Sequence, residues 1–421
     1  MTDFDFLGIG VGPANLSLAA LAAPVTELTA EFLEAKPEFR WHPGLMLPDS
    51  QLTVTFFRDL VTLVDPTSRF SFLNFLVQDG RAFRFLEANG LGCSRREFEQ
   101  YFQWAAAQLP SVRFGTPVES VTLSGEGFEV TSPGGDVRTT RTLVLGSGSE
   151  PHLPDFAKPF ASDSVLHSSK LTAVRPEWKG RRVLVVGAGQ SGAEVVSHLL
   201  SDENALPSSL TWTSGRIGFQ PLDDSPFTNE WFAAPFVDYF NGLSDRRRAE
   251  ILREQKDAGG DGITDELLTS VYRRLYHLDM VLDSQMRHCL LPSRRAVGLE
   301  RDGSHYVAEL LDVNHDSVQR LPVDLVIFCT GYRRGIPEYL KPLHDRLRLV
   351  DGDFAIRPDY TIDFDGPEDL KIYIQGLAER THGIADSLLS LASWRSARIL
   401  NSIAGCEIHR VDNTTTTVAW Q

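Results

Sequence analysis

Short hydrophobic runs alternate with helical stretches along the chain, and one such unit occurs twice. In the first copy the apolar run at residues 4–9 leads into a glycine-rich turn, a helical stretch at residues 16–23 and a strand at residues 29–33. In the second copy a strand at residues 183–186 precedes a glycine-rich turn, a helix and a strand at residues 210–213. Strands that alternate with helices predict a mostly parallel, doubly wound sheet. The expected fold class is therefore α/β, with two Rossmann-like dinucleotide-binding domains.

The first glycine-rich turn has the spacing of a dinucleotide-binding fingerprint. Gly10-x-Gly12-x-x-Asn15 follows a strand and opens a helix, with Pro13 at the helix start. The two glycines allow a tight turn and a close approach to a pyrophosphate, which the helix N-terminus then stabilises. Asn15 stands where the fingerprint has a third glycine. Glu34 follows the second strand, near where an acidic residue binds a ribose hydroxyl; the alternative for the motif is a simple tight turn.

The second turn carries the complete fingerprint GxGxxG. The strand after it ends without an acidic residue and continues as TSGR at residues 213–216. Hydroxyl groups and a cation at Ser214 and Arg216 suit the 2′-phosphate of NADPH. The alternative is that Arg216 is an ordinary surface arginine. The residues that the fingerprint assigns to the cofactor are Gly187, Gly189, Gln190, Ser191 and Gly192.

Two further loops follow apolar strands and resemble the crossover segments of flavoproteins that bind two dinucleotides. One is GSGSEPHLP at residues 146–154, and the other contains Thr330, Gly331 and Tyr332 after the apolar run at residues 323–328. A chain with two dinucleotide sites can carry hydride from a nicotinamide to a flavin. FAD and NADPH are therefore the expected cofactors.

Charge and composition exclude several classes of function. The formal net charge is −15, so binding to nucleic acid or to an anionic membrane is not expected. The 4 cysteines lie far apart, in neither a zinc pattern nor a disulfide framework, and no metal is expected. No apolar run reaches the ~20 residues of a membrane span. The acidic N-terminus is unlike a signal peptide, so we expect a cytoplasmic protein.

Several unusual segments point to one family. They are FRWHPGLM at residues 39–46, DLVT at 59–62, DPTS at 65–68, SFLNFL at 71–76, RREF at 95–98, LDDSPF at 222–227 and THGI at 381–384. With these segments the chain resembles, over roughly residues 4–405, the flavin-dependent N-hydroxylating monooxygenases of siderophore biosynthesis. This family includes lysine N6-, ornithine N5- and diamine N-hydroxylases, and the resemblance is closest to the lysine and diamine branch.

The resemblance implies a reaction and a domain arrangement. NADPH reduces FAD, molecular oxygen adds to the reduced flavin as a C4a-hydroperoxide, and the terminal amine of the substrate attacks the distal oxygen. No metal and no catalytic side chain is required, because the cofactor performs the chemistry and the protein excludes water. The expected domains are an FAD-binding domain at 1–165 that returns at 325–345, an NADPH-binding domain at 166–324, a small C-terminal substrate-binding region at 346–405, and a tail at 406–421 that is disordered at 413–417.

The resemblance also implies functions for five residues. Trp41 and His42 fall where the family packs residues against the flavin. Asn229 matches an asparagine that binds substrate near the nicotinamide, and Ser387 and Ser390 match a segment that lines flavin and substrate. Without the resemblance, Trp41 and His42 would be interpreted as core packing with a hydrogen bond, Asn229 as a helix N-cap, and the two serines as polar groups at a helix start.

Arg58 bears on the choice of substrate. It occupies the position where amino-acid hydroxylases of the family carry a lysine that holds the substrate carboxylate, and diamine hydroxylases carry a small apolar residue. The guanidinium fork suits a carboxylate, although Arg58 has Asp59 and Asp65 as alternative partners. Thr53 replaces a glutamine of ornithine hydroxylases, and residues 268–272 lack their Asn-Tyr pair. We therefore expect L-lysine as substrate, with putrescine or cadaverine as the alternative and L-ornithine less favoured.

Two other functions are compatible with a flavin site. Flavoproteins that perform Baeyer–Villiger or sulfide oxidation have their own signature between the nucleotide sites, whereas this chain has HSSK at residues 167–170, closer to the N-hydroxylases. A non-catalytic FAD-binding redox module would not need the intact second fingerprint. The expected partner is a small aliphatic amine, and the family's common oligomeric states make a homodimer or homotetramer the expected assembly.

Overall fold

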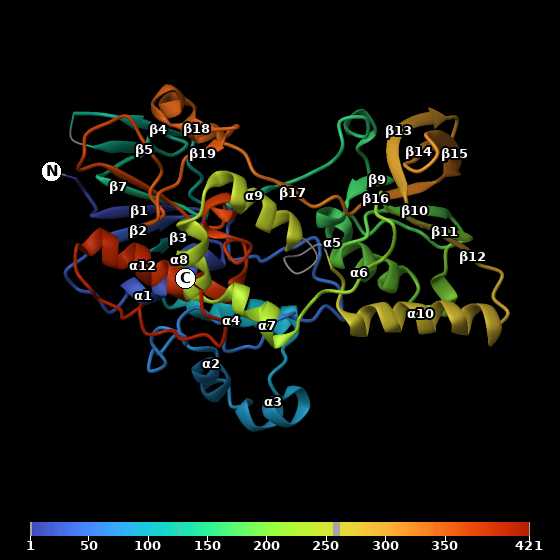
Figure 1. The fold of residues 1–421 in the computed structure, drawn as a ribbon, viewed down its shortest axis with the longest axis horizontal. Helices are drawn as coiled ribbons and strands as arrows, with labels where there is room; N and C mark the ends of the chain where they lie inside the picture. Colours follow the sequence, from blue (N-terminus) through green and yellow to red (C-terminus); the bar gives the residue numbers. More distant parts are fainter. Residues whose placement is uncertain (1, 126, 256–261, 421) are drawn as a thin grey trace.

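The computed structural model describes residues 2–125, 127–255 and 262–420, which form two lobes (Figure 1). The first lobe is built on a five-stranded sheet in the order β20-β7-β1-β2-β3, in which all neighbours are parallel. Its strands are β1 (Phe6–Ile9), β2 (Ala30–Leu33), β3 (Val112–Arg113), β7 (Thr142–Leu145) and β20 (Lys371–Ile374). Strand β1 is buried along its whole length, as is typical of a parallel sheet covered on both faces.

Alternate residues of these strands enter two different cores. Phe6, Phe32 and Tyr373 pack towards the helices drawn below the sheet in Figure 1, whereas Leu7 and Ile372 pack towards the β-meander above it. The helices are α1 (Pro13–Ala22), α4 (Arg95–Ala107) and α12 (Ala392–Ala404). The opposite cover consists of β4 (Ser120–Leu123), β5 (Phe128–Thr131), β6 (Val137–Thr140) and the 3₁₀ helix η5 (Glu338–Arg346). Strands β4, β5 and β6 form an antiparallel meander, and the next strand, β7, joins the main sheet.

The second lobe repeats this plan. Its sheet has the order β12-β11-β10-β16-β9, again with parallel neighbours. The strands are β9 (Val165–His167), β10 (Arg182–Val186), β11 (Ser209–Thr213), β12 (Arg287–Leu291) and β16 (Leu325–Phe328). One face is covered by α6 (Gln190–Leu199) and α10 (Asp265–Met280), the other by an antiparallel sheet of β13 (Arg294–Asp302), β14 (His305–Asp312) and β15 (Ser317–Val323).

The residues of β10 show why both covers are needed. Val183 and Val185 enter the core with α6 and α10, while Leu184 and Val186 enter the core with β13–β15. A strand that is buried on both sides has an apolar residue at every position, and β10 follows this rule after Arg182. The two Rossmann-type sheets confirm the predicted fold class.

The remaining elements are short or lie at the surface. They are α2 (Phe72–Gln78), α3 (Ala82–Asn89), β8 (Glu150–Pro151), η1 (Lys158–Phe160), η2 (Ser168–Lys170), α5 (Leu171–Val174), η3 (Glu203–Ala205), α7 (Pro226–Asn229), η4 (Glu230–Phe232), α8 (Ala234–Asn241), α9 (Asp245–Glu254), β17 (Tyr332–Arg333), β18 (Leu349–Val350), β19 (Asp353–Phe354), α11 (Glu379–His382) and η6 (Leu389–Leu391). Helix α9 is rich in charged residues and mostly exposed. No helix in the described part of the chain is long and apolar enough to cross a membrane.

The chain returns to the first lobe later than predicted. The run at residues 325–328 was expected there, but it forms β16, which pairs with β10 and β9 of the second sheet. The chain re-enters the first lobe at η5, whose Leu340 and Leu343 pack in the core above the first sheet, and β20 then pairs with β7. Residues 346–405 are therefore part of the first lobe rather than a separate region. A four-residue apolar strand does not reveal its neighbour, because any buried parallel strand has the same pattern.

The tail is also more ordered than predicted. The backbone N–H groups of Thr417 and Val418 donate to the two carboxylate oxygens of Glu230, at 2.6 and 2.7 Å. The Trp420 ring packs edge-on against Phe236 of α8, with 4.8 Å between ring centroids. The polar composition of residues 413–417 predicted disorder, but contacts with η4 and α8 hold this segment in place.

Candidate active site

The first glycine-rich turn forms a cradle at the end of β1. Gly10 has a φ of 84°, and a Cβ on it would lie 2.8 Å from the carbonyl oxygen of Gly146. Only glycine fits there. A Cβ on Gly12 would meet no atom nearer than 3.9 Å, and Pro13 opens α1 directly afterwards. The chain therefore leaves room at Gly12, where the N-terminus of α1 fits the pyrophosphate of FAD.

Asn15, at the third fingerprint position, is fully buried and bonded on both sides of its amide. Its Nδ2 donates to the carbonyl oxygens of Gly10 at 2.8 Å and Val144 at 3.2 Å. Its Oδ1 accepts a hydrogen bond from Gln375 Nε2 at 2.8 Å. The side chain thus replaces the close helix–strand packing of a glycine with hydrogen bonds to β7 and to the loop after β20.

Glu34 ends β2 beside this cradle. One carboxylate oxygen accepts the backbone N–H of Val11 at 2.8 Å, and the other accepts that of Lys36 at 2.9 Å. The carboxylate therefore supports the glycine-rich turn from the side where the sequence predicts a ribose. Its contact with a ribose hydroxyl stays a prediction.

The second glycine-rich turn is packed more tightly than the first. Gly187 has a φ of 121°, and a Cβ on it would lie 2.2 Å from the carbonyl oxygen of Cys329. A Cβ on Gly192 would lie 2.1 Å from the carbonyl oxygen of Gly187, so α6 approaches β10 closely. Gly189 caps α6, which leaves the helix N-terminus, with the backbone of Gln190 and Ser191, as the phosphate position.

The residues expected to select NADPH lie next to this turn. Thr213, the last residue of β11, pairs with Val186 and accepts the backbone N–H of Gly187 at 2.8 Å. Ser214 is buried directly after it, and Arg216 is half-buried two residues on. The parallel register therefore brings the predicted 2′-phosphate residues beside the glycine-rich turn. Their contact with NADPH stays a prediction.

The two predicted crossover loops lie side by side between the lobes. Tyr332 and Arg333 form β17, which pairs antiparallel with β8. The carbonyl oxygen of Gly331 accepts the backbone N–H of His152 at 2.9 Å, and Thr330 Oγ1 donates to the carbonyl oxygen of His152. Thr330, Gly331 and Tyr332 thus join the end of β16 to the loop that leaves β7, which is where the two nucleotide sites meet.

Trp41 and His42 lie at this junction. Trp41 is half-buried, its ring packs edge-on against Phe102 with 5.3 Å between centroids, and its backbone N–H donates to Glu99 at 2.8 Å. The His42 ring lies 6.3 Å from the Tyr332 ring. The surrounding protein lowers the pKa of His42 to about 4, first by removing water and then through the charge of Arg95. His42 is therefore neutral at neutral pH.

The predicted substrate residues come from three separate segments. Arg58 is half-buried in the loop before α2, Asn229 is exposed at the end of α7, and Ser387 and Ser390 lie in the loop before α12, with only Ser390 buried. Asn229 occupies the N-cap position of η4, but its side chain makes no capping hydrogen bond there: its Nδ2 donates to the carbonyl oxygen of Asp224. Their convergence on one substrate stays a prediction.

A buried polar network was missed by the sequence interpretation. Gln375, which holds Asn15, accepts a hydrogen bond from Arg395 Nε at 3.1 Å. Arg395 also pairs with Asp386 at 3.1 Å, and their side chains are only 2% and 0% exposed. Asp386 accepts the backbone N–H of Ala378 at 2.6 Å. The network therefore ties the first glycine-rich turn to the loop that carries Ser387 and Ser390. The only sequence signal was a pair of charged residues inside apolar segments.

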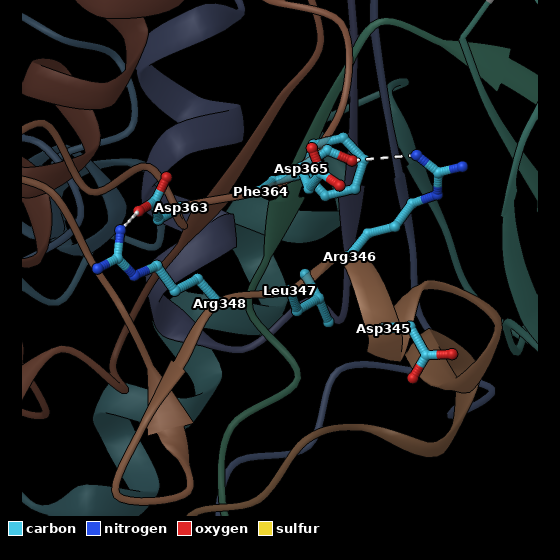
Figure 2. A pocket seen from close by; sticks show the side chains of 7 residues that line it. All are labelled: Asp345, Arg346, Leu347, Arg348, Asp363, Phe364 and Asp365. Atoms are coloured by element: carbon cyan, nitrogen blue, oxygen red, sulfur yellow. Dashed lines mark hydrogen bonds and ion pairs between the residues drawn. The ribbon is translucent and has the colours of Figure 1, made fainter.

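A separate hollow of about 360 Å³ lies at the end of η5 (Figure 2). Arg348 pairs with Asp363 at 3.2 Å, and Arg346 donates to the carbonyl oxygen of Asp365 at 3.2 Å. Its arginines are thus occupied by groups of the hollow itself, and none of the predicted site residues lines it. The candidate active site remains the junction between the two glycine-rich turns.

Comparisons with known proteins agree with this geometry. The family model for L-lysine 6-monooxygenase/L-ornithine 5-monooxygenase matches residues 2–334. L-lysine N6-monooxygenase of Escherichia coli is 37% identical, over 99% of this chain and 98% of the relative. Putrescine N-hydroxylase of Shewanella oneidensis is 35% identical, over 96% of this chain and 81% of the relative.

Solved structures show the same fold with cofactors bound. A cadaverine monooxygenase of desferrioxamine biosynthesis from Erwinia amylovora, bound to FAD, has a TM-score of 0.92 and 30% identity over 99% of this chain and 98% of that chain. An ornithine N-hydroxylase of Kutzneria sp. 744, with reduced FAD, NADP+ and L-ornithine, has a TM-score of 0.88 and 28% identity over 96% and 99%. FAD and NADPH are thus the cofactors, as predicted. The chain belongs to the L-lysine 6-monooxygenase/L-ornithine 5-monooxygenase family, flavin-dependent enzymes that N-hydroxylate an amine for siderophore synthesis.

Proposed function

We propose that this enzyme hydroxylates the N6 amine of L-lysine and supplies N6-hydroxylysine for a hydroxamate siderophore. The sequence identity of the chain to an L-lysine N6-monooxygenase is 37%, and to a putrescine N-hydroxylase it is 35%. Because these values are so close, the choice of substrate is argued from the site. The observation that supports L-lysine is that the half-buried guanidinium of Arg58 has no ion-pair partner among the described residues.

Arg58 is a half-buried cation without a counter-ion. Within the described residues its side chain has no ion pair and no hydrogen bond, and burial lowers its pKa. The two nearby carboxylates are engaged elsewhere: Asp59 accepts the backbone N–H groups of Val61 and Phe72, and Asp65 accepts that of Thr67. The alternative partners considered for Arg58 are therefore occupied.

A carboxylate brought by the substrate would complete this site. A partly desolvated cation is stabilised strongly by an anion that forms hydrogen bonds with it, and the guanidinium fork binds a carboxylate through two of them. L-lysine brings such a carboxylate at the end opposite its reacting amine. Cadaverine or putrescine would bring a second ammonium group there, and like charges repel.

The protein must also favour the neutral form of the amine. A lysine-like amine has a pKa of ~10.4, so well under ~1% is neutral near pH 7. Removal of water from the amine shifts this balance towards the neutral form. Bound FAD supplies the oxygen chemistry that no side chain can supply. The part proposed for Asn229, Ser387 and Ser390 is to enclose and orient the aliphatic amine.

The test compares L-lysine and cadaverine in an Arg58→Met variant. Loss of the carboxylate contact should lower kcat/KM for L-lysine about 30-fold or more, because truncating one partner of a buried charge pair costs ~2–5 kcal/mol. Turnover of cadaverine should stay near the wild-type value or rise. Arg69→Met, on the exposed side of the same loop, is the matched control and should leave both amines unaffected. An equal loss for both amines would make Arg58 structural and contradict the proposal.

A diamine hydroxylase is the second candidate. It is favoured by the TM-score of 0.92 to the cadaverine monooxygenase of Erwinia amylovora. A diamine would place its unreactive ammonium group near Arg58, so another anion would be needed there to balance the two positive charges. Among the described residues, none lies within ion-pair distance of Arg58. We therefore rank it below L-lysine.

A further inference from the structure

Helix α4 contacts both lobes through side chains on one of its faces. Arg95 and Glu99 are four residues apart and so lie above one another on the helix. Glu99 accepts the backbone N–H of Trp41 at 2.8 Å, within the first lobe. Arg95 reaches the second lobe and forms two parallel hydrogen bonds with Glu194 of α6, at 2.7 and 2.9 Å. One helix thus holds the Trp41 segment and the helix of the second glycine-rich turn.

Glu194 connects Arg95 to the start of α6. Gln190, one turn earlier, donates from Nε2 to Glu194 at 3.0 Å, and its Oε1 accepts the backbone N–H of Thr264 at 3.0 Å. Both ends of the Gln190 amide are therefore occupied, so its side chain braces the first turn of α6. Its backbone N–H, at the N-terminus of α6, is the group expected to meet a phosphate.

The contact is shielded from solvent. The side chains of Arg95 and Glu194 are 18% and 6% exposed, unlike the surface ion pairs that are screened by salt and contribute little. A partly buried bidentate pair also fixes direction, because the planar guanidinium and carboxylate must be coplanar. It is therefore suited to set the angle between two lobes.

A second contact between the lobes is a close approach of two backbone segments. A Cβ on Gly44 would lie 1.4 Å from the carbonyl oxygen of Ser169, so the two lobes touch backbone to backbone. Thr172 Oγ1 donates to the carbonyl oxygen of Pro43 at 2.6 Å. The lobes are therefore joined both by these contacts at residues 43–44 and by the ion pair between α4 and α6.

We propose that Glu194, through Arg95 and Gln190, is a positioning residue that fixes the NADPH-binding helix α6 relative to the flavin-side segment at residues 41–44. This inference rests on the assignment of the first glycine-rich turn to FAD and the second to NADPH. Its consequence is that the ion pair affects how the two cofactors meet, and not how the amine binds.

The experiment uses the FAD-loaded enzyme without any amine. Glu194→Gln keeps the shape of the side chain and removes its charge. It should slow anaerobic flavin reduction by NADPH about 10- to 100-fold, the loss expected from an ångström-scale misplacement of reacting groups. Reduction by dithionite and the FAD content should not change. Hydrogen exchange of the backbone amides at residues 189–195, measured without NADPH, should become faster.

Two comparisons make the test specific. Glu203→Gln breaks an ion pair with Arg274 that lies wholly within the second lobe, at 2.9 Å, and should leave flavin reduction unchanged. Adding Glu194→Gln to Arg95→Met should slow reduction no further than Arg95→Met alone, because both act through one contact. Wild-type rates and exchange in Glu194→Gln, or additive losses in the double variant, would overturn the inference. Because no amine is present, these outcomes do not depend on whether L-lysine is the substrate.

Discussion

At the scale of single residues, the site is supported by buried polar groups whose partners are distant in sequence. Gly10 and Gly187 were predicted because a tight turn is a local property that the motif itself specifies. Gln375 was not predicted, since its partner Asn15 is 360 residues away. The same holds for Arg395 and Asp386, which look like ordinary charged residues until the fold buries both. The local chemistry of a motif can be predicted from the sequence, whereas the hydrogen-bond and ion-pair partners of a residue become known only from the fold.

Asp386→Asn should destabilise the protein more than an equivalent change at the surface. The substitution leaves the buried Arg395 without its counter-ion, which typically costs ~3–5 kcal/mol. The matched control is Asp351→Asn, whose pair with Arg380 is at 2.7 Å but has an 80% exposed carboxylate, and which should cost at most ~1 kcal/mol. Urea unfolding of the two variants measures the difference. Similar stabilities would contradict the account of the network.

His382 should make stability fall on mild acidification. Its ring is buried against Tyr360, with 4.0 Å between centroids, and burial lowers its pKa to about 4 from the 6.5 of an exposed histidine. The unfolded chain therefore binds a proton first, so the stabilisation is complete above pH ~6.5 and is lost as the pH falls towards 4. Between about pH 7.5 and about pH 5 the loss is about 2 kcal/mol. In His382→Phe this part of the pH dependence should disappear; parallel curves for the two proteins would refute it.

At the scale of elements, the two strand–turn–helix units were predicted with accurate bounds, because strong periodicity and glycine-rich turns coincide. Strands β16 and β20 show the limit. Both are four-residue apolar strands, and their sequences give no sign that the first belongs to the second sheet and the second to the first. A strand joins the sheet that has an unpaired edge where the strand lies, and the position of that edge depends on the whole fold.

The tail is an element whose function can be tested. It contacts η4 and α8 through Glu230 and Trp420, next to the end of α7 where Asn229 lies. Deleting the residues from Asn413 onward should speed hydrogen exchange in α8, because a local contact is lost. It should also raise KM for the amine about three- to tenfold while KM for NADPH stays the same. If neither KM nor exchange changes, the tail does not support the substrate segment.

At the scale of the whole molecule, loops that leave the two parallel sheets meet between the lobes. Helix α4, the paired strands β8 and β17, and the close contact at Gly44 connect the lobes. The sequence predicted that two nucleotide sites would communicate, because both crossover loops have recognisable motifs. It did not predict the contacts that set their relative position, since these join residues 99 or more apart.

The most direct test of the proposed function is the product formed from each of four amines by the wild-type, FAD-loaded enzyme. NADPH consumption and hydroxylamine product are measured together with L-lysine, L-ornithine, cadaverine and putrescine. We expect N6-hydroxylysine in near-stoichiometric yield with NADPH, and a kcat/KM for L-lysine at least about tenfold above that for the other three amines. A higher kcat/KM for cadaverine or putrescine, or NADPH consumption that gives only peroxide with all four, would contradict it.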